Sequence, residues 1–84
     1  MKALFLDRDG VINEDYGYVH SIDNFVFKPG VFDFAAKARD FGFVIIVITN
    51  QAGIGRGYYT EKAFIELNHW MIRQFVLNDI DILQ

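Results

Sequence analysis

Two aspartates lie close together near the start of the chain, in the run Asp7-Arg8-Asp9-Gly10. Such a pair suits a two-step phosphoryl transfer, in which one carboxylate attacks phosphorus while the other protonates the leaving oxygen and then accepts a proton from water. Carboxylates this close repel each other, and Mg²⁺ relieves the repulsion because it accepts carboxylate, carbonyl and phosphate oxygens together. On this segment alone, a pair of aspartates that only caps a turn after a strand is an equally open interpretation.

A second polar segment, Thr49-Asn50-Gln51, is followed by the glycine-rich run 52–57. A hydroxyl group and the backbone N–H groups of such a loop can hold the oxygens of a phosphoryl group. The guanidinium of Arg56 could bind another anionic group of the substrate, because its planar fork fits phosphate or carboxylate oxygens. An ordinary flexible loop is the alternative.

Each polar segment follows an apolar run, 3–6 before Asp7 and 43–48 before Thr49. Both runs lack polar alternation, which predicts strands of a parallel sheet that is covered on both faces. The residues between them predict a helix that starts at Pro29-Gly30 and stops at Gly42. A strand, a crossover helix and a parallel strand place both carboxyl ends at one edge of the sheet, where open α/β sheets bind ligands.

Downstream, Thr60 is the expected N-cap of a second helix with one apolar face. Residues 80–83 predict a third strand that has only begun when the chain stops at Gln84. The stretch 14–28 predicts a flap or small hairpin over the strand ends. The apolar face of the second helix contains Phe64, Leu67, Met71 and Phe75.

The 84 residues allow one small domain, and 52% of them are hydrophobic. A net charge of -3 argues against nucleic acid or an anionic membrane as partner, and the absence of cysteine excludes disulfides and thiolate metal sites. The longest apolar run, 43–48, is too short to span a membrane. We therefore expect a soluble, cytoplasmic protein that binds a small phosphorylated substrate.

The run 5–13 together with Thr49-Asn50-Gln51 resembles the haloacid dehalogenase (HAD) superfamily of phosphatases, in its DxDG nucleophile motif and its Thr/Ser motif. With residues 17–20, 49–57 and 59–61, the chain most resembles the heptose-1,7-bisphosphate 7-phosphatases and the histidinol-phosphate phosphatases. The resemblance covers nearly the whole chain and implies an α/β, partial Rossmann-like HAD fold, with a parallel sheet and flanking helices. It implies that residues 1–84 are the amino-terminal portion of a HAD phosphatase domain, truncated at about the start of the third strand.

The resemblance also implies roles for individual residues. Asp7 is the nucleophile and a metal ligand, and Asp9 is the acid/base, which also contributes its backbone carbonyl to the metal. Thr49 is the third catalytic residue and holds the phosphoryl oxygens. The residues that it implies for substrate binding are Asp15, Tyr16, Gly17, Tyr18, Asn50, Gln51 and Ala52. Arg56 joins this set on electrostatic grounds, because its guanidinium suits an anionic group.

The implied function is Mg²⁺-dependent hydrolysis of a phosphomonoester through an aspartyl-phosphate, on a sugar bisphosphate of carbohydrate metabolism. Histidinol phosphate is the alternative substrate. Members of the family have a phosphate-neutralising Lys or Arg, a further metal-binding Asp and a Cys/His zinc loop in a portion with no counterpart in this chain. An inactive fragment that only binds phosphate or associates with itself therefore stays open. A phospho-acceptor receiver domain is disfavoured, because its phosphorylated aspartate lies on a later strand.

Two helices cannot cover both faces of the predicted sheet, and its last strand has an unpaired edge. Bare apolar surface and unpaired strand edges both favour association of chains. We therefore expect a homo-oligomer formed through uncovered sheet or helix surface, with Trp70, Met71, Phe75 and Leu77 as candidate contacts.

Overall fold

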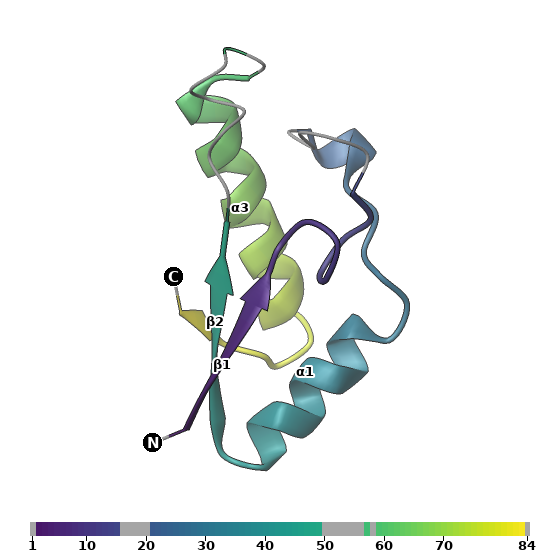
Figure 1. Cartoon of the computed structure of the whole chain (residues 1–84), viewed down its shortest axis with the longest axis vertical. Helices are drawn as coiled ribbons and strands as arrows, with labels where there is room; N and C mark the ends of the chain where they lie inside the picture. The colour runs from purple at the N-terminus through teal and green to yellow at the C-terminus, as the bar shows by residue number, and fades with distance from the viewer. Residues whose placement is uncertain (1, 16–20, 50–56, 58, 84) are drawn as a thin grey trace.

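The computed structural model describes residues 2–15, 21–49, 57 and 59–83. In this part of the chain, strands and helices alternate as the sequence predicts, which confirms an α/β fragment with a parallel sheet and flanking helices (Figure 1). The short 3-10 turn η1 lies between the first strand and the first helix. The elements are β1 (Lys2–Asp7), η1 (Ile22–Asn24), α1 (Val31–Asp40), β2 (Phe43–Ile48), α3 (Glu61–Val76) and β3 (Ile82–Leu83).

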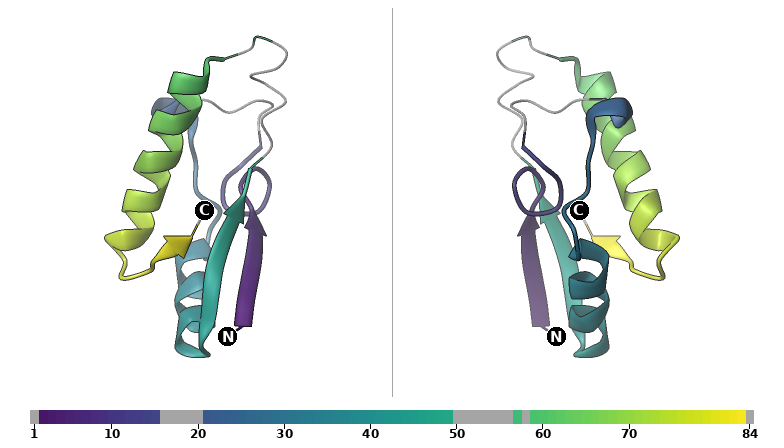
Figure 2. Two further views of the ribbon diagram at one scale, coloured as in Figure 1. Left: turned by 90° about the vertical axis from the view of Figure 1, so that its left-hand side faces the viewer. Right: turned by 90° about the vertical axis from the view of Figure 1, so that its right-hand side faces the viewer.

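The sheet has the strand order β1-β2-β3, and both pairs of neighbours are parallel. Two crossovers of the usual right-handed kind that step in the same direction place their helices on the same face of a sheet. The core agrees, because side chains of both helices pack in one cluster with Leu6, Ile45 and Val47 of the strands. Figure 2 shows α1 and α3 on the same side of β1 and β2. The helical members of this cluster are Val31, Ala35, Leu67, Met71 and Phe75.

The opposite face of the sheet is open, so the prediction of strands buried on both faces is wrong for this part of the fold. Phe5 is 59% exposed, Ile48 49% and Leu83 52%. Phe5 is in register with Ile46, which is in register with Leu83, so the three residues form an apolar row across the sheet. The apolar runs suggested two buried faces, but the strand order places the two described helices, α1 and α3, on the same face.

Most of the residues expected at a contact surface lie in the core instead. Met71 and Phe75 have no exposed surface. The ring of Trp70 is half-buried, with its centroid 5.6 Å from that of Phe25 and 5.8 Å from that of Phe27. Only Leu77, which is 72% exposed, could serve as predicted.

The helix boundaries follow their sequence signals. Gly30 precedes α1 with a φ of 79°, a left-handed conformation that a residue with a Cβ adopts at a cost. The Oγ1 atom of Thr60 accepts a hydrogen bond of 3.0 Å from the Ala63 N–H, as expected of an N-cap. β3 is shorter than the predicted strand 80–83, because the N–H of Ile80 bonds to the Phe75 carbonyl and closes the turn after α3.

Replacing Thr60 by alanine should lower the free energy of unfolding by about 1 kcal/mol, because the first turn of α3 loses its side-chain acceptor. The measurement is urea denaturation followed by circular dichroism. Thr60→Ser keeps the hydroxyl and is the matched control. Equal losses in the serine and alanine variants would show that the cap does not stabilise α3.

Candidate active site at the carboxyl ends of the strands

The two polar segments meet at one edge of the sheet. Asp7 ends β1 and is in register with Ile48, which ends β2, so Thr49 follows directly beyond the partner of Asp7. The backbone N–H of Arg8 donates to the Ile48 carbonyl at 3.1 Å, which extends the ladder to the end of both strands. Asp7 is exposed and Thr49 is half-buried. The carboxylate at the end of β1 and the hydroxyl just beyond β2 therefore lie at the same edge of the sheet, as the sequence predicts.

A tight turn follows β1 and fixes the backbone around Asp9. The Arg8 carbonyl accepts hydrogen bonds from the N–H groups of Ile12 at 2.9 Å and Asn13 at 3.1 Å. Gly10 adopts a φ of 89° and donates its N–H to the Asn13 carbonyl at 2.8 Å. The Ile12 side chain has no exposed surface and belongs to the core. The turn is thus anchored to the core as well as hydrogen-bonded within itself.

The carboxylate of Asp9 accepts three hydrogen bonds from two neighbours. Nε and Nη2 of Arg8 each lie 3.2 Å from a different oxygen, Oδ1 and Oδ2 respectively. Nδ2 of Asn13 donates to Oδ1 at 2.9 Å and also contacts the Glu14 carbonyl at 3.0 Å. The Asp9 side chain nevertheless keeps 23% of its surface exposed. Asp9 is therefore held by three hydrogen bonds while part of its side chain stays exposed to solvent.

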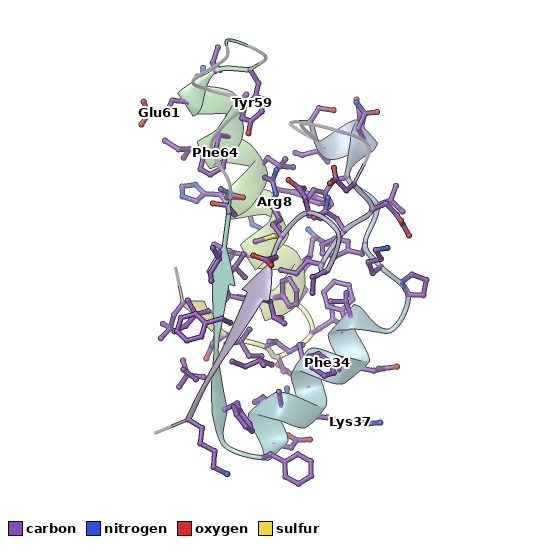
Figure 3. The ribbon with its side chains drawn as sticks, in the orientation of Figure 1. Arg8, Phe34, Lys37, Tyr59, Glu61 and Phe64 are labelled. Atoms are coloured by element: carbon purple, nitrogen blue, oxygen red, sulfur yellow. The ribbon has the colours of Figure 1, made fainter. Side chains whose placement is uncertain are left out.

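Sequence reasoning gave no role to Arg8 or to Asn68 on α3. The Arg8 side chain is 1% exposed and donates from Nη1 to Oδ1 of Asn68 at 3.2 Å. Its guanidinium carbon lies 5.9 Å from the ring centroid of Phe25 and 5.8 Å from that of Phe64. Figure 3 shows Arg8 between the end of β1 and α3, below Phe64. The signal available in the sequence is the position of Asn68, a polar residue within the apolar stripe of a helix.

The ends of the predicted flap 14–28 lie side by side. The Glu14 N–H donates to the Val26 carbonyl at 2.7 Å, and the Lys28 N–H donates to the Ile12 carbonyl at 2.8 Å. Nζ of Lys28 also lies 3.2 Å from Oε2 of Glu14. These contacts form the base expected of a small hairpin, and its role as a flap stays a prediction.

Of the residues expected to bind substrate, the structure describes only Asp15, which is exposed. The others lie outside the described residues: Tyr16, Gly17, Tyr18, Asn50, Gln51, Ala52 and Arg56.

The described residues contain no group of three or more His, Cys, Asp or Glu side chains that could hold a metal ion. Mg²⁺ does not need such a group, because it keeps several water ligands and binds through one or two carboxylates together with a phosphate. The exposed carboxylate of Asp7 and the backbone carbonyl of Asp9 fit this smaller ligand set. None of the described helices is long and apolar enough to cross a membrane.

Comparison with known proteins identifies close relatives, although no protein-family model matches the chain. The D-glycero-beta-D-manno-heptose-1,7-bisphosphate 7-phosphatase of Haemophilus influenzae is 48% identical over 81 residues, which are 96% of this chain and 44% of that protein. The D-glycero-alpha-D-manno-heptose-1,7-bisphosphate 7-phosphatase of Burkholderia mallei is 60% identical over 70 residues, which are 83% of this chain and 37% of that protein. The chain thus spans less than half the length of these relatives.

Solved structures that share the fold include two that cover 98% of this chain. The D,D-heptose 1,7-bisphosphate phosphatase of B. bronchiseptica, complexed with magnesium and phosphate, superposes with a TM-score of 0.89 and 29% identity over 98% of this chain and 46% of that one. A HAD-like phosphatase of Mesorhizobium loti superposes with a TM-score of 0.86 and 35% identity over 98% of this chain and 39% of that one. By sequence and by fold, the chain therefore belongs to the haloacid dehalogenase superfamily of phosphatases, and it corresponds to the amino-terminal part of its relatives.

Proposed function

We propose that this chain carries the nucleophile half of a Mg²⁺-dependent phosphatase that hydrolyses a sugar bisphosphate. The observation that supports this most directly is the register of β1 and β2, which brings Asp7 and Thr49 to one edge of the sheet. Carboxyl edges of parallel strands are where α/β proteins bind their ligands.

In the proposed reaction, a carboxylate oxygen of Asp7 attacks phosphorus and the ester oxygen of the sugar leaves, which gives an aspartyl-phosphate. Asp9 donates a proton to the leaving oxygen and then takes a proton from the water that hydrolyses the intermediate. The Thr49 hydroxyl donates a hydrogen bond to the phosphoryl group. Bound Mg²⁺, held by the Asp7 carboxylate and the Asp9 carbonyl, would neutralise the phosphate and make it accessible to an anionic nucleophile.

The substrate proposal rests on the relatives, whose names specify D-glycero-D-manno-heptose 1,7-bisphosphate in either anomeric form. We propose that Asp15, Tyr16, Gly17 and Tyr18 contact the sugar. Asn50, Gln51, Ala52 and Arg56 would bind the substrate from the second loop, where the Arg56 fork suits an anionic group. Histidinol phosphate, the runner-up, has a single phosphate and gains nothing from such a second anion site.

The protein with Mg²⁺ should release phosphate from heptose 1,7-bisphosphate faster than from histidinol phosphate. For the 84-residue chain alone we expect slow turnover, because it has no counterpart of the family's phosphate-neutralising Lys or Arg and further metal-binding Asp. Loss of one such group typically lowers the rate on the order of 100- to 1000-fold. Phosphate release is measured with both anomers, with and without a magnesium chelator. A preference for histidinol phosphate, or turnover that survives chelation, would contradict the proposal.

The two aspartates should have separable roles. Asp7→Asn should abolish the aspartyl-phosphate, whereas Asp9→Asn should still form it but release phosphate more slowly, by roughly 100- to 10,000-fold, because the acid/base group is lost. Acid-quenched protein is analysed by mass spectrometry for phosphate on Asp7. An intermediate that persists in Asp7→Asn and disappears in Asp9→Asn would reverse the assignment.

We also propose that the open face of the sheet associates with a second copy of the chain. The row of Phe5, Ile46 and Leu83 provides apolar surface, and β1 and β3 are both edge strands in the described sheet. Burial of apolar surface contributes about 25 cal/mol per Å², and edge strands add unpaired backbone donors and acceptors.

Replacing Phe5 by glutamine should weaken self-association by at least about tenfold, because a large apolar side chain leaves the centre of the interface. Sedimentation equilibrium at micromolar concentration measures the dissociation constant. Phe41→Gln is the matched control, since Phe41 is 74% exposed but follows α1 and lies off the sheet. A monomeric wild-type chain, or equal effects of both substitutions, would contradict the proposed interface.

A further inference from the structure

Arg8 is a cationic side chain in the interior of a small domain. Burial of an unpaired cation is costly, so a buried arginine requires partners that offset its lost hydration. The described contacts supply them: the Asp9 carboxylate on one side, Asn68 of α3 on another, and the faces or edges of two aromatic rings nearby. With these contacts on several sides, the Arg8 guanidinium has a fixed position and restricts the orientation of the Asp9 carboxylate.

The contact with Asp9 uses the shape of the guanidinium. Two nitrogens, Nε and Nη2, meet the two carboxylate oxygens at 3.2 Å each, while Nη1 reaches Oδ1 of Asn68, also at 3.2 Å. A lysine has the same charge but a single nitrogen, so it cannot make the paired contact with Asp9 and also reach α3. The geometry therefore ties the orientation of the Asp9 carboxylate to the position of α3, sixty residues further along the chain.

We propose that Arg8 is a positioning residue for Asp9, and that Asn68 anchors Arg8 to α3 so that the Asp9 carboxylate keeps one orientation. This inference rests on the proposed function, because it takes Asp9 to be the acid/base. Proton transfer depends on the placement of the donor, and a displacement of about 1 Å can cost on the order of 100-fold in rate. Asn13, which holds Oδ1 of Asp9 at 2.9 Å, restrains the same carboxylate from the turn.

The test is a double-mutant cycle of Arg8→Lys and Asp9→Asn, assayed for phosphate release from heptose 1,7-bisphosphate with Mg²⁺. Arg8→Lys alone should lower kcat roughly 10- to 100-fold and leave KM within about twofold, because the sugar contacts are intact. In the Asp9→Asn background it should cause no further loss, since there is no acid/base group left to place. Equal losses in both backgrounds would assign Arg8 a merely structural role, and a rise in kcat would show that Arg8 keeps Asp9 away from the substrate.

A matched control exists within the chain. Arg39 is also followed by an aspartate and also pairs with it, at 3.1 Å from Nε to Oδ1 of Asp40, but its side chain is 40% exposed. Arg39→Lys should leave kcat unchanged. If Arg8→Lys does not fold, Asn68→Ala removes only the anchor, and its smaller loss of kcat should likewise vanish in the Asp9→Asn background.

Hydrogen exchange of the arginine Nε–H groups, followed by NMR, tests the contact without any turnover. The buried Arg8 proton should exchange at least about tenfold more slowly than that of Arg39, and Asn68→Ala should reduce this protection. Exchange of Arg8 as fast as that of Arg39 would overturn the inference. Slow exchange in a protein that hydrolyses no phosphomonoester would reject the proposed function, and with it the catalytic purpose of the contact, while the tether to α3 would stand.

Discussion

The parallel ladder between β1 and β2 is the constraint on which the rest of this structure depends. It pairs six residues of each strand and ends with the hydrogen bond from the Arg8 N–H to the Ile48 carbonyl. Because the ends of the strands are level, Asp7 and Thr49 leave the sheet at the same edge. Side chains alternate between the faces of a strand, so the same register decides which residues meet the helices.

That alternation places Arg8 and Asp7, which are neighbours in the chain, on opposite faces of the sheet. Leu4 and Leu6 point toward the helices, and Arg8, two residues further on, continues in that direction and contacts α3. Asp7, one residue out of phase, lies on the open side and is exposed. A shift of register by one residue would exchange these faces, turning Leu6 out of the core and Asp7 into it. The hydrophobic core therefore fixes the orientation of the site as well as the fold.

The sequence predicted the elements well, because their signals are local. Thr60 and Gly30 mark the starts of helices through their own side chain and backbone, and the apolar runs end within one residue of the ends of β1 and β2. It failed on coverage of the sheet, since the side on which a helix packs depends on strand order, and residue types do not encode that order. Continuous apolar runs looked the same whether one face or both were covered.

The two Arg-Asp pairs of the chain show that residue types also fail to predict the surroundings of a side chain at the site. Arg8-Asp9 and Arg39-Asp40 are identical dipeptides, and both arginines contact the following carboxylate. Only the fold distinguishes them, because the first arginine is enclosed by α3 and two aromatic rings while the second lies on the surface of α1. The resemblance to phosphatases singled out Asp9 by its motif, but it could not reveal Asn68, which comes from a distant helix. An ion pair that is screened by water contributes little to the conformation of its side chains, and a buried ion pair contributes more. The same dipeptide can therefore position the Asp9 carboxylate at the site and have little effect at Asp40.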